Sequence, residues 1–286
     1  PFNFNTVDGA TVISALFHDG GINKSGLPHY SNPENLELRQ KIYEAFTNVF
    51  GEFISKKSNP IENQQLYFPK IVGTIITYGL GIPCGRRTVN NPSIPQFIHH
   101  SSNEVKSAFV RQAFDDESHV HRSQGTISLK LSSGSKKPSN IIIDDKSLLE
   151  KLGIDVSGPH YVNSYTTKDG RTAHRWYILI SHYDNLKKFH EKVGFHSIYK
   201  QKRLQEIVSN IKRYQYSTRK ANAIYLSACN CLQRKYGFIT SKELAIEIGR
   251  SQSLAKKIIQ KFVKGKILLV EDNRHGNRGA KYQVKT

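Results

Sequence analysis

Two short apolar stretches of the sequence end in acidic side chains. The stretch "TVISALFHDGGI", residues 11–22, carries Asp19, and the stretch "FVRQAFDDESHV", residues 109–120, carries Glu117 after two further acids. Both stretches have the composition of a short helix. A carboxylate at the C-terminal end of a helix faces the negative end of the helix dipole, which costs roughly 0.3–1 kcal/mol. A sequence that does this twice needs a compensating positive charge, and a divalent cation that prefers oxygen ligands is the strongest candidate.

The two acids meet at one end if the two helices pack side by side about a pseudo-twofold axis. Small residues on both helices favour such close packing, namely Ser14, Ala15, Ala108 and Ala113. Two carboxylates that share one or two metal ions beside a basic surface suit the hydrolysis of phosphodiesters, because the metal activates water and stabilises the leaving oxygen. The sequence therefore predicts that Asp19 and Glu117 bind Mg²⁺ or Mn²⁺.

Plainer interpretations of neighbouring residues stay open. The Asp-Gly dipeptide at residues 19–20 also closes helices as a simple turn. Asp115 and Asp116 fit solvated side chains, and we leave them out of the predicted site. His119 and His121 have the spacing of a metal-binding pair on a strand, but the alternation around them favours an exposed or DNA-facing sheet surface.

The overall charge indicates the class of partner. The 286 residues include 42 Lys and Arg against 23 Asp and Glu, which gives a formal charge of +19. Such a charge favours nucleic acid as the partner, with an anionic membrane as the alternative. No run of about 18 apolar residues and no signal peptide is evident, so we expect neither a membrane protein nor a secreted one. The three cysteines lack zinc-site spacing and favour a reducing, cytoplasmic location, associated with the nucleoid in a prokaryote.

The first 213 residues form an approximate internal repeat in the order helix, strand, helix, strand, helix. In the first half we expect these elements at residues 10–19, 27–32, 32–51, 65–72 and 73–82. In the second half we expect them at residues 108–117, 125–133, 144–154, 174–181 and 185–195. A basic residue follows each half at matched spacing, since Arg87 lies five residues after Ile82 and Lys200 lies five after Phe195. The matched order of elements and the matched spacing of the basic residues indicate two related halves, residues 1–100 and 101–213.

The last segment, residues 218–286, differs in composition and pattern. It has 15 Lys and Arg against 4 Asp and Glu, so +11 of the total charge lies here. Helices are predicted at residues 220–235, 241–249, with Ser241 as N-cap, and 251–265, followed by strands at 266–272 and 280–286. Three helices and a two-stranded wing predict a winged helix–turn–helix domain for binding DNA.

Candidate DNA-binding residues follow from this arrangement. In and before the second helix of the helix–turn–helix we expect groove contacts from Arg250, Gln252, Ser253, Lys256 and Lys257, although the two lysines also fit an ordinary solvated helix face. In the wing, Arg274, Arg278 and Lys281 suit phosphate contacts, which position a protein without reading the sequence. In the strands, Lys130 and Arg175 alternate with apolar neighbours, so they face away from the core, where they can reach base edges in the major groove.

The two acidic motifs match a known family. "VISALFHDG" and "VRQAFDDES" resemble the two signature motifs of LAGLIDADG homing endonucleases. The segments that follow, "LYFPKIVGTIITYGLGIPCGRRT" and "DNLKKFHEKVGFHSIYKQKRL", resemble the corresponding segments of archaeal two-motif members, so that the resemblance covers about residues 1–205. The second motif departs from the family pattern at Ser118, where glycine is preferred, and at Gln112, where a small residue is preferred.

The resemblance implies a fold and an activity. It implies an α+β protein with two pseudo-symmetric αββαββα halves whose saddle-shaped antiparallel sheets lie in the major groove of DNA. It implies that Asp19 and Glu117 are metal ligands and that Arg87 and Lys200 are basic residues near the scissile phosphates. We therefore expect a monomeric, Mg²⁺-dependent endonuclease that cuts both strands of DNA at a specific site.

Two other functions remain open. One is a DNA-binding transcriptional regulator that does not cleave, for which the sporulation regulators that join a degenerate LAGLIDADG unit to a helix–turn–helix are the precedent. The other is a maturase that helps an intron RNA to fold. The retained acids favour cleavage, because a protein that only binds DNA has little need of two carboxylates at helix ends.

Overall fold

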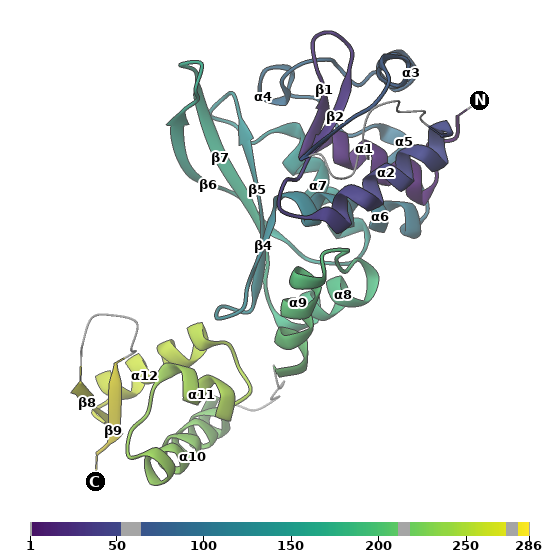
Figure 1. Ribbon diagram of the computed structural model, residues 1–286. Helices are drawn as coiled ribbons and strands as arrows, with labels where there is room; N and C mark the ends of the chain where they lie inside the picture. Colours follow the sequence, from purple (N-terminus) through teal and green to yellow (C-terminus); the bar gives the residue numbers. More distant parts are fainter. Residues whose placement is uncertain (1, 53–63, 211–217, 273–279, 286) are drawn as a thin grey trace. The chain divides into compact units, whose positions relative to one another are not determined.

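A computed structural model describes residues 2–52, 64–210, 218–272 and 280–285 (Figure 1). These residues form an α+β protein with 12 helices and three antiparallel sheets of three, four and two strands. The chain divides into two compact units, of which the larger contains residues 1–120 and 127–202 and the smaller contains residues 121–126 and 203–286. Within the described residues, no helix combines the length and the apolar character needed to cross a membrane.

Two helices of the larger unit begin at capping side chains, α1 (Val7–Phe17) and α6 (Asn103–Glu117). The hydroxyl of Thr6 accepts a hydrogen bond from the amide of Gly9, and the hydroxyl of Ser102 accepts one from the amide of Val105. Such caps stabilise a helix because the first amides have no partner within it. Both helices begin earlier than the sequence predicts, α1 at residue 7 instead of 10 and α6 at residue 103 instead of 108.

Helices α1 and α6 pack against each other, as the sequence predicts. Every residue of α1 from 9 to 17 is buried, and the hydroxyl of Ser14 donates a hydrogen bond of 2.7 Å to the backbone oxygen of Phe109. The small residues expected at this contact, Ser14, Ala15, Ala108 and Ala113, are all buried. Each large apolar side chain that α1 buries contributes roughly 1.5–3 kcal/mol. This pairing fixes the relation between the C-terminal ends of the two helices.

The first half adds a three-stranded antiparallel sheet and two helices. Its elements are β1 (Gly20–Ile22), β2 (Pro28–Ser31), α2 (Leu36–Phe50), β3 (Gln65–Tyr67) and α3 (Lys70–Leu80), with the strand order β1-β2-β3. The strand expected at residues 65–72 is wrong beyond Tyr67, because Pro69 ends the strand and α3 begins at Lys70. Proline suits this boundary, since it lacks the amide hydrogen that a strand interior needs and its φ fits a helix start.

Gly20 joins α1 to β1 at a place where no side chain fits. A Cβ atom on Gly20 would lie 2.5 Å from the backbone oxygen of His29 and 2.7 Å from that of Ala15. At the matching junction between α6 and the next strand, Ser118 is tolerated, and its hydroxyl donates a hydrogen bond to the backbone oxygen of Phe114. The departure of the second motif from glycine is thus accommodated by the local structure.

The second half contains a four-stranded antiparallel sheet. Its elements are β4 (Ser118–His121), β5 (Thr126–Ser133), α7 (Asn140–Lys151), β6 (Ser157–Thr166), β7 (Thr172–Ile180) and α8 (Tyr183–Lys192), with the strand order β4-β5-β7-β6. Strand β6 is not predicted by the apolar pattern, because eight of its ten residues are exposed. Helices α4 (Arg87–Asn90) and α5 (Gln96–His100) come before α6, at the end of the first half, and α9 (Ile198–Asn210) follows α8.

In the smaller unit, the described residues from 218 onward form three helices and a two-stranded sheet. These are α10 (Thr218–Tyr236), α11 (Ser241–Glu247), α12 (Gln252–Lys264), β8 (Leu268–Asp272) and β9 (Lys281–Val284). The predicted apolar face of α12 is confirmed, since Ile258, Ile259 and Phe262 are buried in the core of this unit and Leu254 packs against it. The predicted N-cap of α11 is wrong by one residue, because Thr240 rather than Ser241 accepts the hydrogen bond from the amide of Glu243.

Candidate active site at the ends of two paired helices

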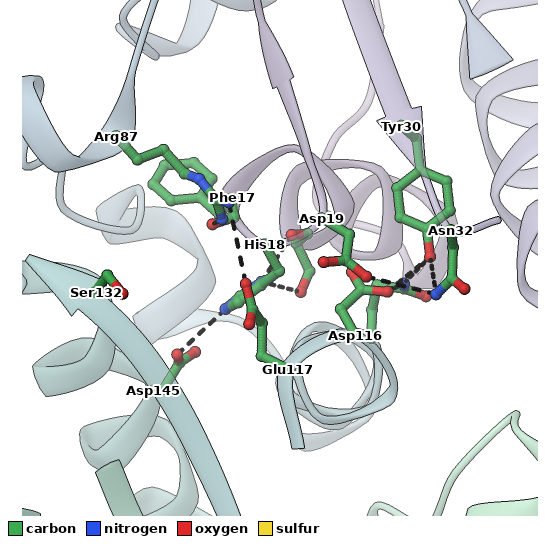
Figure 2. A network of polar contacts seen from close by, with 12 residues as sticks. Phe17, His18, Asp19, Tyr30, Asn32, Arg87, Asp116, Glu117, Ser132 and Asp145 are labelled. Atoms are coloured by element: carbon green, nitrogen blue, oxygen red, sulfur yellow. Dashed lines mark hydrogen bonds and ion pairs between the residues drawn. The ribbon is translucent and has the colours of Figure 1, made fainter. Parts of the chain in front are cut away.

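The structure brings the predicted metal ligands to neighbouring helix ends. Asp19 stands between the end of α1 and β1, and Glu117 is the last residue of α6. Figure 2 shows both side chains, together with that of Asp116, at the same end of the helix pair. Burial raises the pKa of Glu117, and the charge of Asp19 raises it further, while Arg87 acts in the opposite direction. The two acids therefore lie within electrostatic reach of each other.

Arg87 and Lys200 occupy equivalent places on the two helices. The guanidinium of Arg87 donates a hydrogen bond to the backbone oxygen of Phe17, and the ammonium of Lys200 donates one of 2.6 Å to that of Asp115. Phe17 and Asp115 each lie two residues before a predicted metal ligand. Because a cation at a helix C-terminus offsets the helix dipole, these side chains supply the positive charge that compensates the two helix-end carboxylates. The helix-end carboxylates alone therefore no longer demand a metal ion.

Each of these basic residues also approaches the acids. Nη2 of Arg87 lies 4.0 Å from Oε1 of Glu117, and the two side chains are 32% and 25% exposed, so that the pair stays accessible to solvent. Burial raises the pKa of Asp19, whereas the charges of Arg87 and Lys200 lower it. Burial lowers the pKa of Lys200, and the nearby acids oppose this shift. The site is thus a half-buried mixture of acids and bases with opposing effects on protonation.

Asp115 positions Lys200. The prediction that Asp115 is solvated is wrong, because its side chain is only 2% exposed. Its carboxylate accepts hydrogen bonds from the amides of His196, at 2.8 Å, and Ser197, at 3.0 Å, just before α9 begins. Burial raises the pKa of Asp115 to about 6, although these hydrogen bonds act against the shift. An acid at a helix N-terminus is favourable, and here it holds the start of α9 so that Lys200 reaches back to α6.

Asp116 is also largely enclosed, so the solvated interpretation is wrong for it as well. Its Oδ1 accepts hydrogen bonds from the hydroxyl of Tyr30, at 2.6 Å, and from the amide of Gln112, at 2.8 Å. Its Oδ2 is buried and has no hydrogen-bond partner among the described residues. Burial raises the pKa of Asp116 well above its usual value, and the charge of Asp19 adds to this effect. Gln112, which departs from the small residue that the family prefers, thus serves to hold Asp116.

His18 stands at the position in the first motif that Asp116 holds in the second. Its Nε2 lies 3.2 Å from Oδ2 of Asp145 on α7, its Nδ1 lies 2.8 Å from the backbone oxygen of Ser14, and it is fully buried. Burial alone would lower the pKa of His18, but the charge and hydrogen bond of Asp145 outweigh this effect and raise it. Neither His18 nor Asp116 is predicted from the sequence, although their matched place just before Asp19 and Glu117 is a signal that could have singled them out.

The donor set fits a hard divalent cation. Asp19 and Glu117 supply carboxylate oxygens, and the orphaned Oδ2 of Asp116 is the kind of buried acceptor that a cation or a proton satisfies. The described residues contain no cluster of three or more His, Cys, Asp or Glu side chains that could by itself hold a metal ion. Mg²⁺ needs no such cluster, because it usually keeps several waters and takes one or two carboxylates. The residues present therefore fit Mg²⁺ better than a structural metal.

The predicted base-reading residues lie on one face of the four-stranded sheet. Lys130 is exposed on β5, and Arg175 is half-buried on β7, where it pairs in register with Ser132. The guanidinium of Arg175 lies 5.0 Å from the centre of the Tyr165 ring on β6. The pairing of β6 with β7 also places Asn163 opposite Arg175. The polar side chains from β6 were not predicted, because that strand was missed.

The predicted DNA-binding residues of the C-terminal segment are only partly described. Lys256 and Lys257 are exposed on α12, whereas Arg250, Gln252 and Ser253 are half-buried. The ammonium of Lys281 on β9 lies 4.1 Å from the centre of the Phe238 ring. Arg274 and Arg278 lie outside the described residues.

Comparison with known proteins adds no family. No model of a known protein family matches the chain, and no curated protein matches it either.

Proposed function

We propose that the protein is a site-specific endonuclease of the two-motif LAGLIDADG type, which cuts both strands of DNA as a monomer with Mg²⁺ or Mn²⁺. One observation carries this proposal. Asp19 and Glu117 lie at adjacent ends of two paired helices, and an equivalent basic side chain binds the backbone oxygen two residues before each acid. An arrangement with twofold pseudo-symmetry suits a reaction that must be performed once on each of two antiparallel strands.

Each residue then has a role in hydrolysis. Asp19 and Glu117 would hold the cation, which would supply activation of water and stabilisation of the leaving oxygen. Arg87 and Lys200 turn from their helix-end positions toward the scissile phosphates, whose charge they offset in the transition state. The overall reaction bonds the oxygen of water to phosphorus and breaks one P–O bond; one proton of the water goes to the departing oxygen, and the other stays on the product phosphate until solvent takes it. Asp116 stays fixed by Tyr30 and Gln112 next to these two acids.

The remaining parts provide DNA binding in this proposal. The two halves, residues 1–100 and 101–213, correspond to αββαββα units whose saddle-shaped sheets contact the major groove, where Lys130 and Arg175 reach base edges. Residues 218–286 correspond to a winged helix–turn–helix, with α12 in the groove and the strand residue Lys281 near phosphates. The charge of +19 supports a polyanionic partner. A cytoplasmic location, at the nucleoid in a prokaryote, follows from the same partner.

A cleavage assay with matched variants tests the proposal. The wild-type protein is incubated with a randomised duplex library and Mg²⁺, and cleaved ends are sequenced. Asp19→Asn and Glu117→Gln should remove cleavage while binding persists, whereas Glu34→Gln, which changes an exposed acid of the same unit, should cleave normally. Cleavage that persists in both site variants would overturn the assignment of the acids.

A DNA-binding regulator without cleavage is the second candidate. Arg87 and Lys200 already offset the helix ends, and Arg87 lies close to Glu117, so the acids have a stabilising setting without a metal ion. Binding of a defined duplex by the wild type without any cut in the presence of Mg²⁺ or Mn²⁺ would favour this function. Preference for a structured RNA over duplex DNA in the same assay would favour an intron maturase.

A further inference from the structure

The larger unit contains a polar hollow that the proposed active site does not use. It has a volume of about 670 Å³ and opens between α4, the end of β5 and the turn that joins β6 to β7. Its lining combines two guanidinium groups with several hydroxyl groups, namely Arg86, Arg171, Thr88, Ser133, Thr167 and Thr172. Among the described residues, no carboxylate belongs to this lining. The hollow is therefore basic and rich in hydrogen-bond donors.

The two arginines are held in place by one acid outside the hollow. Oδ2 of Asp169 accepts hydrogen bonds from Nε of Arg171, at 2.8 Å, and from Nη1 of Arg86, and it forms an ion pair of 2.6 Å with Nη2 of Arg171. The hydroxyl of Thr167 donates to the other carboxylate oxygen at 2.6 Å, and this hydrogen bond, together with that from Arg171, lowers the pKa of Asp169. A guanidinium carries five N–H donors, so both arginines keep donors beyond those that Asp169 uses. Together, Arg86, Arg171 and Asp169 carry a net positive charge.

The walls of the hollow are fixed by backbone contacts. A Cβ atom on Gly134 would lie 2.2 Å from the backbone oxygen of Thr88, which shows that the residue directly after β5 touches α4. Asn91, at the end of α4, is held to the start of α7, since its side-chain oxygen accepts a hydrogen bond from the backbone amide of Asn140 at 2.9 Å and its backbone oxygen accepts one from the Asn140 side chain at 2.9 Å. A site that is formed before its ligand arrives loses less conformational entropy on binding.

We propose that this hollow binds a phosphate-bearing nucleotide unit of the DNA strand, with Arg86 and Arg171 on its phosphate. The volume falls within the roughly 300–1,000 Å³ of small-molecule sites, which admits a nucleotide and exceeds the need of a single phosphate. The planar donors of arginine match phosphate oxygens. Arg86 directly precedes Arg87, so the bound nucleotide lies beside the proposed cleavage centre. The inference rests on the proposed function only for the identity of the ligand as DNA.

Two variants test the hollow by different routes. Arg171→Gln removes one phosphate contact, and Thr172→Trp fills the hollow without changing the charge. Binding of a mixed-sequence duplex is measured without divalent metal over a series of KCl concentrations. Loss of one phosphate contact should reduce the slope of log K against log salt by about 0.9, which corresponds to roughly eight-fold weaker binding near 0.1 M salt. Lys187→Gln is the matched control, because Lys187 is an exposed lysine of the same unit that does not line the hollow.

The outcomes separate this inference from the proposed function. Weaker binding by both variants, with normal thermal unfolding and an unchanged control, supports the hollow as a DNA phosphate site, even if Mg²⁺ then produces no cleavage and the nuclease proposal fails. Binding equal to wild type in both variants overturns the site, even if cleavage is intact. If adenosine monophosphate or inorganic phosphate raises the unfolding temperature of the wild type but not of Arg171→Gln, while the duplex is not bound at all, DNA as the source of the phosphate is overturned.

Discussion

His18 and Asp145 form an ion pair of 3.2 Å in which both side chains are fully buried. The pair joins α1, in the first predicted half, to α7, in the second. Removing one partner of a buried pair leaves the other charge without compensation, which typically costs about 3–5 kcal/mol. Asp145→Asn should therefore lower the free energy of unfolding, measured with urea, by about 3 kcal/mol. Glu150→Gln on the same helix is the control and should change it by less than about 0.5 kcal/mol, since Glu150 pairs with Lys146 at the surface.

The same pair predicts how stability depends on pH. Asp145 raises the pKa of His18 above its ordinary value of 6.5, so the folded protein keeps a proton that the unfolded chain loses. The stabilisation is then fully present below about pH 6.5 and is lost as the pH rises through the higher folded value. Urea midpoints measured on both sides of this range should fall with rising pH in the wild type and less so in Asp145→Asn. Equal pH dependence in the two proteins would count against the charged pair.

The acid cluster predicts a gain in stability when one acid is neutralised. Burial raises the pKa of both Asp19 and Glu117, so their charged forms cost free energy in the folded state at neutral pH. Because both folded values are raised, this cost appears as the pH rises through the range between the unfolded and folded values. Asp19→Asn should therefore raise the unfolding temperature in the absence of divalent metal. Mg²⁺ should raise that of the wild type by mass action and leave that of Asp19→Asn unchanged.

Lys200 should contribute to both stability and cleavage. Its ammonium donates hydrogen bonds to the backbone oxygens of Phe114, at 3.0 Å, and Asp115, at 2.6 Å. Lys200→Met should lower the free energy of unfolding by about 1 kcal/mol, because a cation at a partly buried helix end contributes this amount. In a single-turnover assay with supercoiled plasmid carrying the target, the variant should accumulate nicked circles, since Arg87 still serves the other strand. Direct conversion to linear product at the wild-type rate would contradict the role in cleavage.

Gly20 should tolerate no side chain. A Cβ atom there would lie 2.5 Å from the backbone oxygen of His29, so Gly20→Ala must displace the α1–β1 junction and should cost about 2 kcal/mol of unfolding free energy. Gly79→Ala on α3 is the matched control, because nothing lies within 4 Å of a Cβ atom at that position. This control should instead stabilise the protein by about 0.5–1 kcal/mol, since alanine favours the helix. Thermal unfolding of the two variants under the same conditions distinguishes the two effects.

Local sequence patterns predict many of the helices and strands, but they do not predict the contacts between residues distant in the sequence. The helices that end near Asp19 and Glu117 are predictable because their apolar runs and acidic ends are contiguous in the sequence. Strand β6 is not predictable in this way because most of its side chains are exposed, so it lacks the apolar alternation that marks a half-buried strand. The start of α3 was misplaced because the apolar run continues across Pro69 from strand to helix.

The site was predictable in its acids and not in their surroundings. The repeat placed Asp19 and Glu117 in equivalent positions, and helix ends are readable from composition. The hydrogen bond from Tyr30 to Asp116 joins residues 86 apart, and the pair of His18 with Asp145 joins residues 127 apart. No periodicity along the chain reports such contacts. The sequence therefore predicts solvated side chains for Asp115 and Asp116, whereas contacts with residues distant in the sequence bury both.

The unlike partners of His18 and Asp116 have a consequence for how the two halves can combine. Two copies of the first half would bury two imidazoles without the Asp145 that receives them, and two copies of the second would bury two carboxylates without Tyr30. Self-assembly of either half is thereby disfavoured, whereas their union in one polypeptide is favoured. Under the proposed function, a permanent difference between the two halves means that the DNA site need not be a palindrome and can carry unrelated sequences on its two sides.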